Sequence, residues 1–133
     1  MKKLLIILFM PLISMAQLQQ TYVPDDNFEA ALEYMGIGNG IPNDNYVTTA
    51  NISDITNLLI YSQGISDLTG IEDFLSLGRL SVQDNQLTSI DLSNNTDLKI
   101  LHVNDNQLTQ LDLSNNPMIE ILHGFNNPGL ECI

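Results

Sequence analysis

The stretch SVQDNQLTSIDLSNNTDL, residues 81–98, returns 21 positions later as HVNDNQLTQLDLSNNPMI, residues 102–119, and again as HGFNNPGLECI, residues 123–133. Leucine recurs in step through these segments, at Leu80, Leu101 and Leu122. A fixed period of this length indicates a stacked array, because one coil cannot bury its apolar side chains without a neighbour. The repeat therefore decides the fold of this 133-residue chain.

Within each period the residues follow L-x-x-L-x-L-x-x-N-x-L, the signature of a leucine-rich repeat. We expect a mostly β leucine-rich repeat solenoid of the α/β horseshoe type, with a short parallel sheet on its concave face. The first coil stands 22 residues before the second, and Ile71, Phe74 and Leu75 predict a short helical turn on its return side. The array is expected to span 55–133 in about 3.5 coils, at 55–76, 77–97, 98–118 and 119–133.

The return side of the second and third coils alternates apolar and acidic residues around Asp91 and Asp112. Alternation with period two predicts a second extended segment in each coil, with apolar side chains inward and acids outward. The final coil ends before such a segment would begin. We therefore expect its core side chains to lose their covering neighbour.

Residues 1–16, MKKLLIILFMPLISMA, begin with two lysines, continue with an apolar run from Leu4 to Ile13 and end in a small-x-small sequence. This pattern predicts a secretory signal peptide with cleavage before Gln17. An uncleaved amphipathic anchor is disfavoured because the run has no polar face. We expect a secreted chain in the periplasm, at the cell surface or outside the cell, with no membrane insertion after cleavage.

Residues 17–54 are expected to form a helical cap and the loop that leads into the array. Segment 25–35 predicts an amphipathic helix whose apolar face holds Phe28, Ala31, Leu32 and Met35. Asp25 and Asp26 offer N-cap oxygens, and Gly36 can end the helix in a left-handed conformation. Residues 46–48 predict a short strand. The helix is expected to cover the first coil.

The mature chain keeps all 16 acids against Arg79 and Lys99, a net charge of −14. Such a polyanion repels nucleic acid and anionic lipid, because both require clustered Lys or Arg. The acids either solvate a small secreted solenoid or bind divalent cations outside the cell. The single cysteine, Cys132, excludes an internal disulfide and falls at an inward position, which favours a small buried hydrophobe.

An asparagine recurs where the chain turns off the strand, at Asn85, Asn106 and Asn127. A buried amide at such a turn bonds backbone groups of its own and adjacent coils. We predict a structural role for this column. Gln63 stands in the same register in the first coil.

Strand alternation predicts three outward columns on the sheet. The first holds Asn57, Arg79, Ile100 and Ile121; the second holds Leu59, Ser81, His102 and His123; the third holds Tyr61, Gln83, Asn104 and Phe125. Five of these side chains are large, apolar and expected to be exposed, a feature typical of protein-contact patches. The predicted binding residues are Leu59, Tyr61, Arg79, Ser81, Gln83, Ile100, His102, Asn104, Ile121, His123 and Phe125.

His102 and His123 stack in one column, and with Asp105 they define a remote hypothesis of a metal-dependent hydrolase. Ser81 interrupts the column, however, and a stable zinc site needs three or four ligands. The stacked pairs Asp84/Asp105 and Asp91/Asp112 raise calcium as an alternative to solvated acids. Because the chain contains none of the common catalytic motifs, we expect no enzymatic activity and no cofactor.

NQLTSIDLSNNT and NQLTQLDLSNNP resemble the short leucine-rich repeats of secreted proteins from Bacteroidetes-type bacteria, and ISDLTGIEDF resembles the internalin-type repeat. YVPDDNFEAALEYMGIGNG, leading into YVTTANIS, resembles the helical cap that precedes such arrays. The resemblance implies extracellular or cell-surface protein interaction. Family members commonly carry more coils and a C-terminal anchoring domain, and the residues here match neither.

The leading hypothesis is a protein-interaction or adhesion module that binds a protein ligand through its concave sheet. The alternative is a truncated structural fragment of a longer adhesin without independent activity. We also expect weak self-association through the open C-terminal end, because uncovered core and a free strand edge both favour a second copy.

Overall fold

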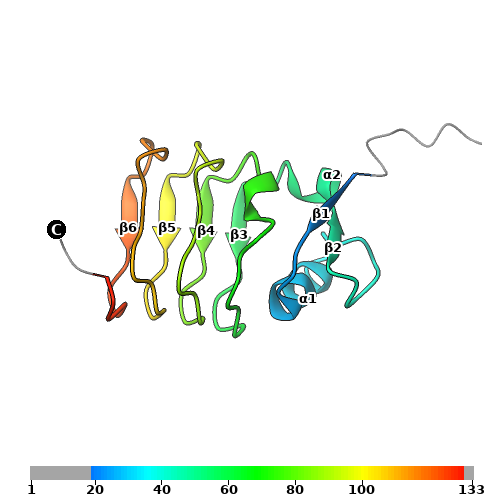
Figure 1. Cartoon of the computed structure of the whole chain (residues 1–133). Coiled ribbons are helices and arrows are strands. Elements are labelled where there is room, and N and C mark those ends of the chain that lie inside the picture. The colour runs from blue at the N-terminus through cyan, green and yellow to red at the C-terminus, as the bar shows by residue number, and fades with distance from the viewer. Residues whose placement is uncertain (1–18, 131–133) are drawn as a thin grey trace, which may run out of the picture.

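The computed structural model describes residues 19–130. The expected signal peptide at 1–16, with its cleavage before Gln17, lies outside the described residues, and so does Cys132. Figure 1 shows an N-terminal block followed by coils stacked side by side in one row. Among the described residues, no helix is both long enough and apolar enough to cross a membrane.

Four short strands form one parallel sheet in the order β3-β4-β5-β6: β3 (Asn57–Leu59), β4 (Arg79–Ser81), β5 (Ile100–His102) and β6 (Ile121–His123). Their central residues pair across the sheet: Leu58, Leu80, Leu101 and Leu122. Each coil thus contributes one strand, and the register follows the sequence period. The chain is a leucine-rich repeat solenoid, as the repeat predicts.

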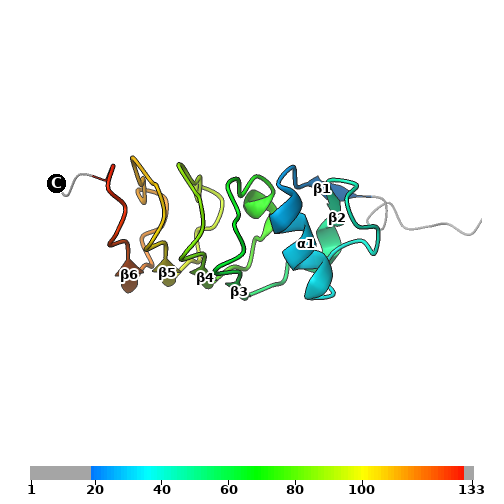
Figure 2. The same ribbon diagram turned by 90° about the horizontal axis from the view of Figure 1, so that it is seen from below.

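The core lies between this sheet and the return segments, which run along opposite sides of the row in Figure 2. The inward leucines Leu58, Leu80 and Leu101 are completely buried. Leu122 is the equivalent residue of β6, yet 45% of its surface is exposed, because β6 is the edge strand of the described array. This matches the expectation that the last coil leaves part of its core uncovered.

The N-terminal block contains a two-stranded antiparallel sheet of β1 (Gln20–Tyr22) and β2 (Tyr46–Thr48), which confirms the strand predicted at 46–48. Helix α1 (Asp26–Tyr34) lies between them in the chain, and a short helix, α2 (Thr49–Ile52), follows. Asp25 is the N-cap of α1, and Gly36 adopts a left-handed conformation at φ +73°, both as predicted. Met35 was expected on the buried face but is 42% exposed, because α1 ends one residue earlier.

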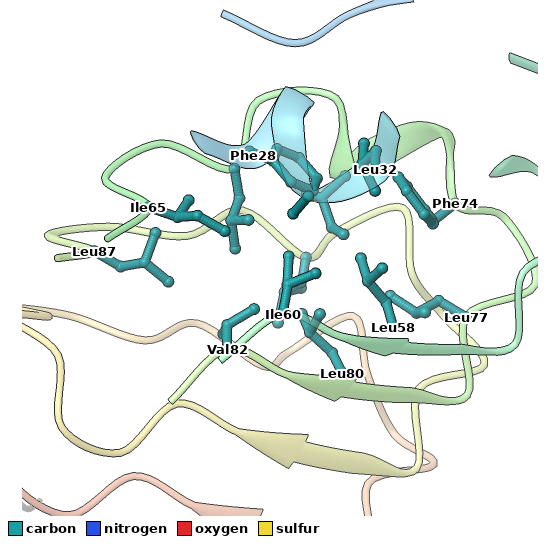
Figure 3. Packing of buried hydrophobic residues seen from close by; sticks show 14 of the residues in the cluster. Phe28, Leu32, Leu58, Ile60, Ile65, Phe74, Leu77, Leu80, Val82 and Leu87 are labelled. Atoms are coloured by element: carbon teal, nitrogen blue, oxygen red, sulfur yellow. The ribbon is translucent and has the colours of Figure 1, made fainter. Parts of the chain in front are cut away.

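Helix α1 covers the first coil (Figure 3). The ring of Phe28 stacks on that of Phe74 with centroids 6.4 Å apart, and both side chains are fully buried. The carboxylate of Asp25 also accepts hydrogen bonds from the backbone N–H groups of Ser66 and Asp67, at 2.9 and 3.0 Å. The helical turn predicted after Gly70 is present as the 3-10 helix η2 (Ile71–Asp73).

The prediction of a second strand on the return side was wrong. Residues 82–99 contain turns and irregular backbone between β4 and β5. The backbone N–H of Ser93 donates to Asp91 Oδ1 at 2.9 Å, and that of Ser114 donates to Asp112 Oδ1 at 2.9 Å. An aspartate that bonds the N–H two residues ahead makes a local turn, which competes with strand pairing. These two acids therefore shape the turn, although both remain exposed as expected.

Candidate ligand-binding face

We call the outward side chains of β3–β6, together with the residue two positions after each strand, the sheet face. The strand register places the first two predicted columns in rows across the sheet. The third column continues these rows, because backbone bonds link Ser62 N–H to the Gln83 carbonyl, Asp84 N–H to that of Asn104 and Asp105 N–H to that of Phe125. The structure thus brings the predicted residues together on one surface.

Large apolar side chains lie exposed at both ends of the sheet face. Leu59 and Tyr61 are 45% and 51% exposed on the first coil, and Ile121 and Phe125 are 43% and 59% exposed on the last. The central coils present side chains of intermediate exposure: Arg79, Gln83, Ile100, His102 and Asn104. Asn57 and His123 are exposed.

Ser81 was expected to be exposed but is only 1% accessible, and this part of the prediction was wrong. Its row neighbours on the adjacent strands are Leu59 and His102, which are both larger. The Ser81 hydroxyl lies 3.3 Å from His102 Nδ1. A small side chain between two large ones is buried beneath them. Ser81 therefore supports the sheet face from below, and its own side chain is not accessible to a ligand.

His102 and His123 stack with centroids 4.5 Å apart and planes inclined by 7°. The His123 ring also lies 6.3 Å from that of Phe125. Partial burial, the neighbouring His123 and the positive charge of Arg79 hold the pKa of His102 below its ordinary value of 6.5. The stacked pair therefore presents a flat aromatic surface on the sheet face.

A groove of about 500 Å³ joins the sheet face to the cap. It lies between α1 and β3, and its lining includes Tyr34, Met35, Leu59 and Tyr61. Tyr34 is 94% exposed. The contribution of α1 to this groove was not predicted from the sequence, because the apolar face of the helix was assigned to the core alone. Tyr34, the aromatic residue at the end of the helix, was the signal that could have indicated it.

The predicted asparagine column forms a buried ladder of hydrogen bonds. Asn106 Oδ1 accepts from the backbone N–H of Leu87 at 3.0 Å, and its Nδ2 donates to the carbonyls of Val82 and Val103 at 2.9 and 3.1 Å. Asn85 and Asn127 make corresponding bonds one coil earlier and one coil later. Each amide ties its own turn to the preceding coil and holds the strands in register.

Sequence reasoning missed a second ladder on the return side. Asn95 and Asn116 are 0% and 3% exposed. Asn116 Nδ2 donates to the carbonyls of Leu92 and Asn95, both at 2.9 Å, and Asn95 makes the equivalent bonds in the coil before. Their Oδ1 atoms are buried and have no partner among the described residues. The repeated Asn-Asn dipeptide of LSNN was the signal for this ladder.

The stacked acids Asp84 and Asp105 have side-chain donors of their own. Ser62 Oγ donates to Asp84 Oδ2 at 2.6 Å, and Asn126 and Asn104 donate to the two oxygens of Asp105 at 2.7 and 2.6 Å. These bonds hold the pKa of Asp105 below its ordinary value. Within residues 19–130, no group of three or more His, Cys, Asp or Glu side chains converges as a metal site requires. Asp105 therefore does not join the histidine pair in a metal-binding triad.

Comparison with known proteins finds no matching family model and no matching curated protein. Three solved structures from Listeria monocytogenes are similar. The functional domain of internalin J, described as including a cysteine ladder, has 28% identity over 86% of this chain, with a TM-score of 0.64. Internalin F has 25% identity over 76% with a TM-score of 0.68, and internalin C2 has 25% over 82% with a TM-score of 0.70.

The chain spans 29%, 30% and 50% of the length of those three structures. The similarity supports an internalin-like leucine-rich repeat protein. This chain has a single cysteine, so the ladders that link its described coils are built from asparagine.

Proposed function

We propose that this chain is a protein-interaction module that binds its partner through the sheet face. The observation that carries the proposal is the exposure of Leu59, Tyr61, Ile121 and Phe125 on one continuous surface. Exposed apolar groups gathered on one face mark a contact site, because water leaves such a surface at a gain in free energy. The groove beside α1 adds a concave pocket of the kind that holds an anchoring side chain.

The proposed setting is the cell surface or the secreted fraction, and the proposed role is binding or adhesion without catalysis. The similarity to internalins and the signal-peptide pattern of 1–16 both support export.

The test uses the purified wild-type chain and two variants as bait for culture-medium and outer-membrane fractions of the producing organism. Replacing Ile100, Ile121 and Phe125 together by Ser should abolish capture of the partner. Replacing Asp91 and Asp112 by Ala should leave capture unchanged, because these residues lie on the return side. Far-ultraviolet dichroism checks that each variant keeps its fold. Capture that survives the triple Ser change would place the site elsewhere.

We further propose that a second copy of the chain associates weakly with the β6 end. Leu122 faces inward yet is 45% exposed, and Met118, which precedes β6, is 49% exposed. Salt should favour this contact, because it screens the repulsion between two acidic chains. Sedimentation at low and high salt should show a larger weight-average mass at high salt. A monomer under both conditions at high concentration would refute the proposal.

A further inference from the structure

The charges of this chain are distributed unevenly. The full sequence contains 16 acids against 4 basic residues, yet none of the twelve residues on the sheet face is an acid. The face instead carries Arg79 and both histidines of the chain, His102 and His123. A face without acids in an acidic protein is thus also the face with exposed apolar side chains.

Arg79 keeps a donor that the described residues do not pair. Its Nε is buried without a hydrogen-bond partner among residues 19–130. Partial burial and the neighbouring His123 lower the pKa of His102 on the adjacent strand, and the charge of Arg79 adds a smaller contribution in the same direction. The partners of Arg79 on the adjacent strands, Asn57 and Ile100, are neutral, so this guanidinium suits the charge-assisted binding of an external carboxylate.

Arg79 on β4 and His123 on β6 face His102, and both are bases. Two acids follow the third column, and both accept side-chain hydrogen bonds: Asp84 from Ser62, and Asp105 from Asn104 and Asn126. At the opposite ends of the strands, Lys99 comes just before β5 and Glu120 just before β6. These two residues carry opposite charges. No acid raises the pKa of His102.

Resting on the proposed function, we infer that the bound segment of the protein partner is an acidic peptide. One of its carboxylates lies against Arg79, His102 and His123, and its apolar side chains lie on Ile121 and Phe125. A short peptide fits better than nucleic acid, because the net charge of the chain repels a polyanion, whereas one or two carboxylates beside apolar groups meet a complementary surface.

The probe is a random dodecapeptide library displayed on phage and selected on the immobilised chain at about pH 6. We expect the recovered peptides to be enriched in Asp or Glu next to apolar residues. The best peptide is then synthesised beside a copy in which every Asp and Glu is replaced by Asn and Gln, and binding is measured by fluorescence anisotropy. Both probes are tested against wild type and against matched variants of the sheet face.

Arg79→Met should weaken binding of the acidic peptide by roughly tenfold, which is the contribution of one charge-assisted hydrogen bond to affinity. Arg79→Lys should retain part of the affinity. Affinity should rise as the pH falls below 6.5, because His102, whose pKa lies below that ordinary value, gains a proton there. The double change of His102→Gln and His123→Gln should remove that rise and leave the fold intact, because both side chains lie on the outer surface of the sheet.

Several results would overturn the inference, and they are distinguishable. Selection of neutral or basic peptides that do not bind the triple Ser variant would be consistent with the proposed function but would refute the acidic partner. The binding face and the inference would both be refuted if the selected peptides bound the triple Ser variant as tightly as wild type. They would also both be refuted if the library yielded no enriched peptides. An equal affinity for the amide copy would also refute the acidic partner.

Discussion

Replacing Asn106 by Ala tests the hydrogen-bond ladder that holds the coils in register. The side chain makes bonds to the backbone of two coils and is only 4% exposed. The carbonyls of Val82 and Val103 keep a second donor after the change, because Asn85 and Asn127 also bond them. The N–H of Leu87 loses its only partner in the described structure.

The expected cost therefore comes mainly from one buried N–H group. Leaving such a donor unpaired costs about 1–3 kcal/mol, and we expect Asn106→Ala to lower the free energy of unfolding by that amount. Asn104→Ala is the control, because its amide bonds the exposed carboxylate of Asp105 and should contribute less than about 0.5 kcal/mol.

The assay is urea unfolding followed by circular dichroism, with the midpoint and slope fitted for each variant. Equal destabilisation by Asn106→Ala and Asn104→Ala would refute the reasoning, because the inward and outward positions would then be equivalent. A neutral effect at Asn106 would show that another group or a water molecule satisfies the Leu87 N–H.

Asn116→Ala should cost less than Asn106→Ala, under about 1 kcal/mol in the same assay, because both carbonyls that Asn116 bonds keep backbone donors; a larger loss would mean that the second ladder carries the greater share of stability. Burial raises the pKa of Asp25, but hydrogen bonds from Ser66 and neighbouring backbone groups outweigh it and hold the pKa below its ordinary value of 3.8. The ionised carboxylate therefore contributes stability above about pH 4 that is lost as the pH falls further. The difference in unfolding free energy between wild type and Asp25→Asn should shrink below about pH 4, and a constant difference would contradict this.

The sheet and its register could be predicted from sequence because the repeat itself specifies them. Inward leucines such as Leu80 and Leu101 must face a common core, and a shift of one residue would expose every one of them. The observed pairing of Arg79 with Ile100 and of Ser81 with His102 follows from that constraint. The cap helix could also be predicted from the sequence, because its N-cap residue and its regularly spaced apolar residues lie within one short segment.

The errors arose where a side chain has two possible roles. Asp91 between apolar residues matches a strand pattern, but its carboxylate bonds the Ser93 N–H and makes a turn. Alternation gives the direction of Ser81 correctly, yet burial depends on the size of neighbours on other strands. Met35 lies just past the end of α1, where helix boundaries decide exposure. Local pattern alone does not determine any of these three outcomes.

The central claim is that ligands bind the sheet face, and methyl NMR of the chain with labelled isoleucine and leucine measures this directly. During titration with the best selected peptide, the methyl signals of Leu59, Ile100 and Ile121 should shift, while those of Leu75 stay constant. Leu75 is a fair control because it is 59% exposed but follows η2 on the return side. Shifts at Leu75 with unchanged signals from Ile100 and Ile121 would contradict the account.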